Sequence, residues 1–142
     1  MTSDGWRITT AAEDPFEDRP AAIDCIPQTV TVEGPALEID TAACDYVTVV
    51  QPSVVDVRAC DVLRATLAHA PLFFEEPAEA HVALYLGARA LFDQRISIPA
   101  DSDVYAIEVE AGEVIEAGTP VFFHVHNHGA NNWFVTDVRL EP

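Results

Sequence analysis

Short runs of alternating residues dominate the chain from Gln28 onward and constrain its fold more than any other feature. These runs are rich in valine, isoleucine, threonine and aromatic residues, and Gly, Pro, Asp and Asn separate them. Such a pattern is typical of β-strands bounded by turns. The strands expected on this basis are 29–33, 36–39, 46–51, 54–58, 62–69, 80–86, 89–98, 103–110, 121–128 and 133–140. Many short strands without a sequence repeat predict an all-β fold, a two-sheet antiparallel sandwich of jelly-roll type.

The first 27 residues differ from the rest of the chain. They are rich in Asp, Glu, Ala and Pro, and they contain few apolar anchors, among them Trp6, Phe16 and Ile23. We therefore expect an extended acidic N-terminal arm over residues 1–27 and a β-sandwich domain over residues 28–142.

The charge of the chain narrows the classes of ligand. Its 142 residues include 24 Asp and Glu against 7 Lys and Arg, which gives a formal net charge of -17. A surface this acidic repels phosphate backbones and anionic lipids, so nucleic-acid binding is disfavoured. No stretch approaches the roughly 18 to 20 apolar residues of a membrane span, so we expect no membrane insertion. Cationic or neutral ligands remain open.

Three cysteines, Cys25, Cys44 and Cys60, leave at least one thiol unpaired within the chain. Cys25 and Cys44 lie in turn-like sequences that flank an expected hairpin, and we predict a disulfide between them. Cys60 is expected to be a buried free thiol at the start of a strand. Such a disulfide implies an extracellular or periplasmic location. Met1 begins no signal-peptide pattern, so the export signal is expected to be absent from this chain.

The segment His124-Val-His-Asn-His128 contains three of the five histidines. Residues two apart on a strand lie on the same face, about 6 to 7 Å from each other. His124, His126 and His128 therefore share a face that we expect to be exposed, whereas Val121, Phe123 and Val125 face the core. On the alternative interpretation, the histidines are half-buried polar residues that hydrogen-bond to the backbone or to nearby asparagines.

A His-x-His pair on a strand is also a candidate zinc or copper site. We select His124, His126 and His81 as the ligand set, while His69, Asp137 and Glu108 stay open as alternatives to His81. The same pair resembles the start of the cupin metal motif. Cupins require a glutamate shortly afterwards, but residues 129–134 contain no acid. The sequence contains no nucleophile elbow, phosphate loop or Cys-x-x-Cys motif, so the question of an enzyme stays open and leans towards none.

The closing stretch consists of Ala117-Gly-Thr-Pro-Val-Phe-Phe123 and Gly129-Ala-Asn-Asn-Trp-Phe-Val-Thr-Asp-Val-Arg-Leu140. It resembles the last two strands of jelly-roll carbohydrate-binding modules. The resemblance implies carbohydrate binding without catalysis. It also implies a calcium ion that ties the N-terminal segment to the last strand, for which the matching positions are Asp4 and Asp137.

The sequence thus predicts a non-catalytic ligand-binding domain, with a glycan or another small neutral molecule as the first ligand class. Aromatic faces stack on sugar rings, and amides or imidazoles bind sugar hydroxyls. The candidate surface consists of His124, His126, His128, Asn132 and Trp133. One alternative is a zinc- or copper-binding domain. Another is a structural module in a cell-surface assembly, in which the arm adds a strand to a neighbour.

Overall fold

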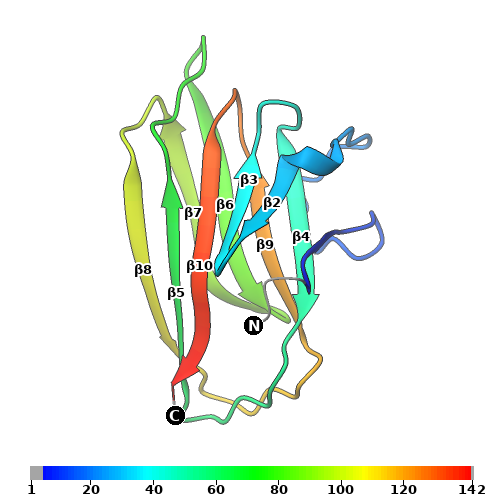
Figure 1. The fold of residues 1–142 in the computed structure, drawn as a ribbon, viewed down its shortest axis with the longest axis vertical. Coiled ribbons are helices and arrows are strands. Elements are labelled where there is room, and N and C mark those ends of the chain that lie inside the picture. Colours follow the sequence, from blue (N-terminus) through cyan, green and yellow to red (C-terminus); the bar gives the residue numbers. More distant parts are fainter. Residues whose placement is uncertain (1–4, 142) are drawn as a thin grey trace.

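Two antiparallel sheets of five strands each pack face to face in the structure, a computed structural model that describes residues 5–141 (Figure 1). The first sheet has the order β1-β4-β9-β6-β7. It contains β1 (Arg7–Ile8), β4 (Tyr46–Pro52), β9 (Pro120–His126), β6 (Ala78–Leu86) and β7 (Arg89–Ile98). The chain is therefore an all-β jelly-roll sandwich, as predicted.

The second sheet has the order β2-β3-β10-β5-β8. It contains β2 (Val30–Glu33), β3 (Ala36–Asp40), β10 (Asn132–Glu141), β5 (Val62–His69) and β8 (Asp103–Glu110). A short 3-10 helix, η2 (Pro27–Thr29), leads into β2. Residues 5–141 contain no helix long and apolar enough to span a membrane.

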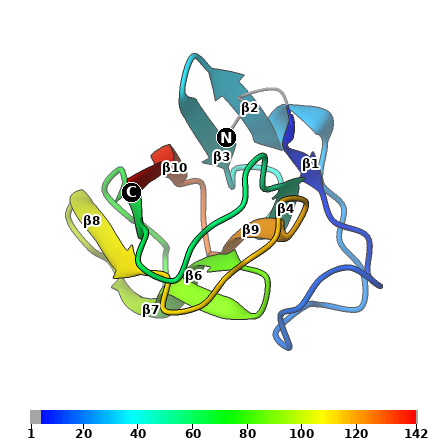
Figure 2. The ribbon, with the colours of Figure 1, turned by 90° about the horizontal axis from the view of Figure 1, so that it is seen from below.

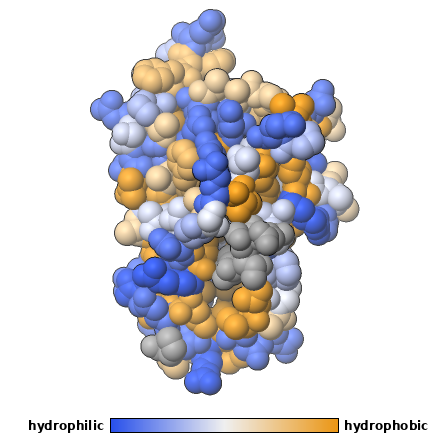
Figure 3. Space-filling view, viewed as in Figure 1, coloured by the Kyte–Doolittle hydropathy of each residue, from blue (hydrophilic) through white to orange (hydrophobic). Residues whose placement is uncertain are grey.

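The core lies between the two sheets and is built by alternate residues of each strand. The first sheet contributes Val82 and Phe123, and the second contributes Leu67 and Trp133, all of them 0% exposed. Burial of such side chains is the main source of stability in a sandwich of this size. On the outer face of the second sheet, hydrophilic and hydrophobic residues are interspersed (Figure 3).

The prediction of a strand at 54–58 is wrong. In this segment only Val57 pairs, through an isolated bridge to Ile115. Val54 and Val55 are exposed, because the chain has passed the end of β4 and crosses to the second sheet beyond the ends of the strands (Figure 1). The expected strand 121–128 also ends earlier, at His126. The last strand contains an irregularity between Thr136 and Arg139.

The N-terminal arm packs against the first sheet. Arg7 and Ile8 form β1, which pairs with Val50 and Val49 of β4. The following segment loops along the outside of β4 and β9 in the view from below (Figure 2). Phe16 of this segment contacts His81 of β6 and His124 of β9, which are more than 60 positions away in the sequence.

The predicted disulfide between Cys25 and Cys44 is present and ties the end of the arm to the loop before β4. Cys60 is a free thiol, as predicted, but it is exposed and not buried. The reason is that Cys60 lies in the turn before β5 and not in the strand itself.

Candidate functional site

The histidines of β9 lie on the outer face of the first sheet, as their alternation predicts. His124 lies opposite Thr48 of β4, and His126 lies opposite both Tyr46 of β4 and His81 of β6. The alternate residues of β9, including Phe123 and Val125, are buried in the core. The register of three neighbouring strands thus brings His81, His124 and His126 together.

The exposure of this face differs from the prediction, because the arm covers it. His124 is 0% exposed, whereas the side chain of His126 is 30% exposed. Phe16 of the arm stacks on the His124 ring, with centroids 4.0 Å apart and planes at 16°. The edges of His81 and Tyr85 also contact Phe16. The expectation that His124 lies on an open surface is therefore wrong.

Asp14 fixes the arm in this position. Its side chain is 0% exposed and forms an ion pair of 2.5 Å with Arg19. Its carboxylate also accepts hydrogen bonds from the Tyr46 hydroxyl, the Thr9 hydroxyl and the Phe16 backbone N–H, at 3.1, 3.2 and 3.1 Å. A buried carboxylate needs such partners, and here they join three parts of the arm to β4.

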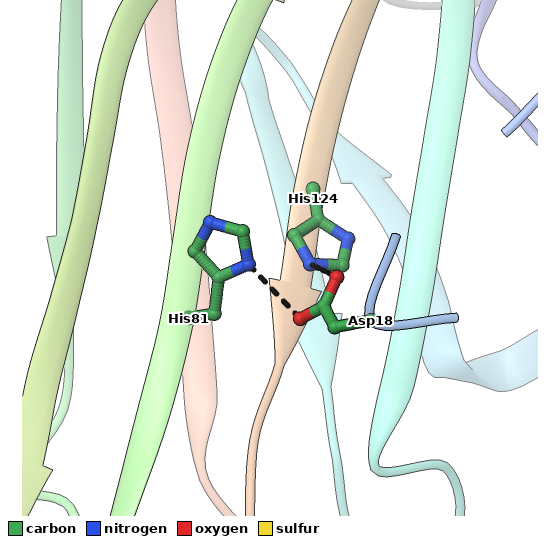
Figure 4. Close-up of side chains that lie close together, drawn as sticks. All are labelled: Asp18, His81 and His124. Atoms are coloured by element: carbon green, nitrogen blue, oxygen red, sulfur yellow. Dashed lines mark hydrogen bonds and ion pairs between the residues drawn. The ribbon is translucent and has the colours of Figure 1, made fainter. Parts of the chain in front are cut away.

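Asp18 lies at the centre of the histidines. Its Oδ2 atom is 3.0 Å from Nδ1 of His81 and 3.0 Å from Nδ1 of His126. Its Oδ1 atom is 3.6 Å from Nε2 of His124, so the carboxylate lies between rings from β6 and β9 (Figure 4). The adjacent His124 imidazole, followed by His81 and His126, holds the pKa of Asp18 well below its usual range. We call Asp18, His81, His124 and His126 the histidine cluster.

A second carboxylate, Asp93 of β7, supports His81 from the opposite side. Its Oδ1 atom is 2.9 Å from Nε2 of His81, and the Tyr85 hydroxyl donates to its Oδ2 atom at 2.6 Å. Burial works to raise the pKa of Asp93, but the hydrogen bonds of Tyr85 and His81 outweigh it and lower the pKa. The hydrogen bond that the Tyr85 hydroxyl donates to Asp93 raises the pKa of Tyr85 to about 12.

His124 is held by one of its two ring nitrogens. Nδ1 lies 2.9 Å from the Thr48 hydroxyl. Within the part of the chain that the structure describes, Nε2 is buried and has no hydrogen-bond partner. Burial lowers the pKa of His124, and the neighbouring Asp18 opposes this effect. The neutral imidazole is therefore favoured, and one lone pair or N–H group is left without a protein partner.

The other predicted histidine, His128, belongs to a different region. The loops 41–45, 70–77 and 127–131 gather at one end of the sandwich, at the top of Figure 1, and we call this region the loop end. Buried Asn131 joins two of these loops: it accepts a hydrogen bond from the Phe73 N–H at 3.0 Å and donates one to the His128 carbonyl at 3.0 Å. Thr41 donates to the Gly129 carbonyl at 2.7 Å, which attaches the third loop.

Gly129 is required where these loops meet. Its φ is 90°, and a Cβ atom at this position would lie 2.4 Å from the Phe73 carbonyl oxygen. Only glycine accepts both this conformation and this close approach. The backbone of loop 70–77 is thus locked onto loop 127–131.

Two phenylalanines project from the loop end into solvent. Phe73 is 67% exposed and Phe74 is 45% exposed. The Phe74 ring lies 5.6 Å from the His128 ring, which in turn lies 5.8 Å from the His126 ring. A hollow of about 350 Å³ beside these histidines is also lined by Asp24 and Asp45.

The structure separates Trp133 and Asn132 from the histidines. Both belong to β10 of the second sheet, and Trp133 is 0% exposed in the core. The expectation that Trp133 shares an exposed surface with the histidines is therefore wrong, because β10 follows β9 in sequence but lies in the other sheet. The Asn132 amide binds Glu38 of β3, which lies in the same sheet.

Three of the alternative metal ligands also lie away from the histidine cluster. His69 packs on Trp133 within the second sheet, and Glu108 pairs with Arg64 on that sheet's outer face. Asp137 is exposed in β10 and has a φ of 55°. Of the predicted calcium pair Asp4 and Asp137, Asp4 lies outside the described residues. His81, the residue selected as the third ligand, is the one that the structure brings to His124 and His126.

Sequence reasoning missed the arm residues Asp14, Phe16 and Asp18 as part of the site. No periodicity or motif marks them, because their partners lie in strands far along the chain. The one available signal was Phe16, an aromatic residue in an otherwise polar segment, which needed an apolar or aromatic surface to cover it.

No protein-family model matches the chain, and no curated protein matches it either. Among solved structures, a protein described as CBM4 has a TM-score of 0.45 and 13% identity over 79% of this chain and 87% of its own. The N-terminal cellulose-binding domain of Cellulomonas fimi β-1,4-glucanase C has a TM-score of 0.44 and 16% identity, over 79% and 81%. A family 16 carbohydrate-binding module has a TM-score of 0.43 and 6% identity, over 84% and 85%. The resemblance inferred from the last two strands was to the same class of module, and at these identities the likeness concerns the fold alone.

Proposed function

We propose that the chain is a non-catalytic carbohydrate-binding domain whose ligand site is the loop end. The observation that carries this proposal is the pair of exposed phenylalanines, Phe73 and Phe74, beside His128. Exposed aromatic rings are unfavourable in water unless a ligand or partner covers them, and they mark binding surfaces. The loop end is therefore where we expect a ligand.

The loop end is built to hold its shape. Buried Asn131 and Thr41 tie the three loops together, and Gly129 allows their close approach. Rings held in one position lose little conformational entropy when a ligand binds, which favours affinity.

The chemistry of this region suits a sugar. The faces of Phe73 and Phe74 offer apolar surface for the C–H face of a pyranose ring, and such stacking contacts dominate many binding sites. The adjacent hollow presents the imidazoles of His126 and His128 and the carboxylates of Asp24 and Asp45. These groups accept or donate hydrogen bonds to hydroxyls, which fixes orientation and specificity.

The net charge of -17 restricts the type of glycan. Sulfated or uronic-acid polymers would meet strong repulsion, most of all at low ionic strength. We therefore expect uncharged polysaccharides to be the ligands. The three solved structures described above are also named as carbohydrate- or cellulose-binding, but the loop end itself carries the proposal.

Affinity electrophoresis tests this proposal. Native gels would contain soluble cellulose derivatives, xylan, mannan or mixed-linkage glucan, and the full chain should be retarded in at least one of them. The double variant Phe73→Ala/Phe74→Ala should lose this retardation. Val114→Ala is the matched control, because Val114 is 71% exposed but lies in the β8–β9 loop at the opposite end of the sandwich. Equal retardation of both variants would contradict the proposed site.

We further propose that the protein acts outside the cytoplasm. The disulfide between Cys25 and Cys44 supports this, since such bonds form and persist in oxidising compartments. An extracellular or periplasmic location would also bring the domain into contact with polysaccharides. Detection of the oxidised form in culture supernatant or periplasmic extract tests this part of the proposal.

A further inference from the structure

The histidine cluster has the composition of a transition-metal site. One carboxylate oxygen of Asp18 and one ring nitrogen each of His81 and His124 all lie within 4.8 Å of one another. Two imidazoles and a carboxylate are ligands that zinc and copper accept, at about 2.0 to 2.2 Å from the ion. Small side-chain rotations would bring the three atoms to these distances from one ion.

Each of the two ring nitrogens of His81 faces a carboxylate, an arrangement that favours a bound cation. Nδ1 of His81 faces Asp18 at 3.0 Å, and Nε2 faces Asp93 at 2.9 Å. A neutral imidazole has only one N–H group, so it satisfies only one of these carboxylates. The nitrogen that faces the other carboxylate must carry a second proton or bind a cation.

His124 also presents a ring nitrogen to Asp18. Its Nδ1 atom lies 2.9 Å from the Thr48 hydroxyl, and its Nε2 atom faces Oδ1 of Asp18 at 3.6 Å. This nitrogen is fully buried and has no hydrogen-bond partner among residues 5–141. At 3.6 Å this nitrogen is too far from Asp18 for a hydrogen bond, and an ion between the two atoms would give both of them a partner.

The residues around these ligands resemble the outer partners of known metal sites. In such sites the second ring nitrogen of each histidine ligand binds a carboxylate, hydroxyl or carbonyl, which fixes the tautomer. Asp93 has this position for His81, and Thr48 has it for His124. A hollow of about 560 Å³, lined in part by Asp18, His81 and Asp93, connects the cluster to solvent and provides a path for an ion.

The charges favour a divalent ion. Among the described residues, the ion-pair contacts of Asp18 are all with histidines. Arg19, the nearest arginine in sequence, is already paired with Asp14. A divalent ion would therefore neutralise a carboxylate that no arginine balances.

We propose that Asp18, His81 and His124 bind one divalent transition-metal ion of the zinc class. His126, whose Nδ1 also contacts Asp18, completes the set as a fourth ligand or leaves that position to water. Because Asp18 belongs to the arm and the histidines belong to β6 and β9, the ion clamps the arm onto the first sheet. The proposed metal ligands Asp18, His81 and His124 lie outside the loop end, whereas His126 also borders the hollow beside it.

Zinc titration of the full chain, purified without a metal-affinity tag and treated with a chelator, tests the proposal. Calorimetry should give one equivalent of Zn²⁺, and the melting temperature should rise with Zn²⁺ concentration. His81→Gln and Asp18→Asn should each weaken binding by more than about 100-fold, and Asp93→Asn by about 10- to 100-fold. His128→Gln is the matched control and should bind as the wild type does, because His128 lies outside the cluster.

Near-UV circular dichroism shows whether each variant keeps its fold. A measurement on the wild type alone does not depend on whether the variants fold. In the zinc-bound wild type, ¹⁵N shifts of the imidazoles should identify Nδ1 of His81 and Nε2 of His124 as the zinc-bound atoms. The proposal is overturned if the wild type takes up no Zn²⁺ and the His81 ring carries two protons. It is also overturned if His128→Gln weakens binding as much as His81→Gln, since the ion would then bind surface histidines.

Discussion

Phe16 lies face to face with His124, with the two ring centroids 4.0 Å apart and the planes at 16°, although 108 positions separate them in the sequence. This stack closes the outer face of the first sheet over a histidine that would otherwise be open to solvent. It also places Asp18, two residues further along the arm, among three histidines. The arm is therefore part of the folded domain and builds one of its two candidate sites.

Replacement of Phe16 tests this role of the arm. Phe16→Ala removes a half-buried ring and its stack on His124, and it should lower the free energy of unfolding by about 1–3 kcal/mol. Guanidinium unfolding followed by fluorescence measures the change. Phe73→Ala is the control, since its exposed ring should change stability by less than about 0.5 kcal/mol. Equal stability of wild type and Phe16→Ala would mean that the arm does not pack as described.

The buried carboxylate of Asp14 gives a second test. Asp14→Asn removes the charge that pairs with Arg19 and weakens the hydrogen bonds from Tyr46 and Thr9, so it should cost about 2–4 kcal/mol. The neighbouring exposed pair, Glu13 with Arg7, is the comparison. Glu13→Gln should cost at most about 1 kcal/mol, because exposed pairs contribute little. Chemical denaturation that ranks the two variants in the reverse order would contradict this account.

The disulfide should contribute substantially to stability. Cys25 and Cys44 are 19 positions apart, and a cross-link that closes a loop of this size contributes about 3 kcal/mol by restricting the unfolded chain. The double variant Cys25→Ser/Cys44→Ser should therefore unfold at a clearly lower denaturant concentration. Cys60→Ser, which changes an exposed free thiol, should leave the midpoint unchanged. If a reductant has no effect on the wild type, this expectation fails.

Tyrosine ionisation gives a test that depends on pH. The chain contains three tyrosines. Burial raises the pKa of Tyr46 and of Tyr105, and the hydrogen bond to Asp93 raises that of Tyr85 to about 12. The unfolded chain loses these protons near pH 10, so the stability that the neutral phenols contribute is present below pH 10 and is lost as the pH rises towards about 12.

Absorbance of the phenolate form measures this ionisation directly. The phenols of the folded protein should ionise above their ordinary pKa of about 10, and Tyr85→Phe should remove the group that ionises near pH 12. A folded protein in which Tyr85 ionises at the ordinary pKa would contradict the contacts described here.

The sequence predicted most strands well, including the edge strands β7 and β8, whose bounds match the expected 89–98 and 103–110. In β9, the alternation of His124 and His126 with Phe123 and Val125 correctly separated the outer face from the core. The segment 54–58 begins with two adjacent valines, and in the structure only Val57 finds a pairing partner, through the isolated bridge to Ile115, so no strand formed. Alternation indicates that a segment favours the extended conformation, but a strand forms only where a neighbouring strand is available for pairing.

The composition of the site was harder to predict because it depends on strand order and on the arm. Trp133 was expected near His126 since the two strands are consecutive, but in a jelly roll the chain crosses to the other sheet between them. Asp18 meets His81 across 63 positions, and no local motif encodes such a contact. The register of β6 with β9 places His81 beside His126, whereas the sequence could select His81 by residue type alone.

The most direct test of the carbohydrate proposal is to map the ligand contact by NMR. Amide shifts of the labelled full chain would be followed during titration with an uncharged oligosaccharide from the polymer that retards the protein. The account predicts that the largest changes fall in the loops 41–45, 70–77 and 127–131, with Phe73, Phe74 and His128 among them. Changes confined to the outer face of the second sheet, or spread evenly over the chain, would contradict it.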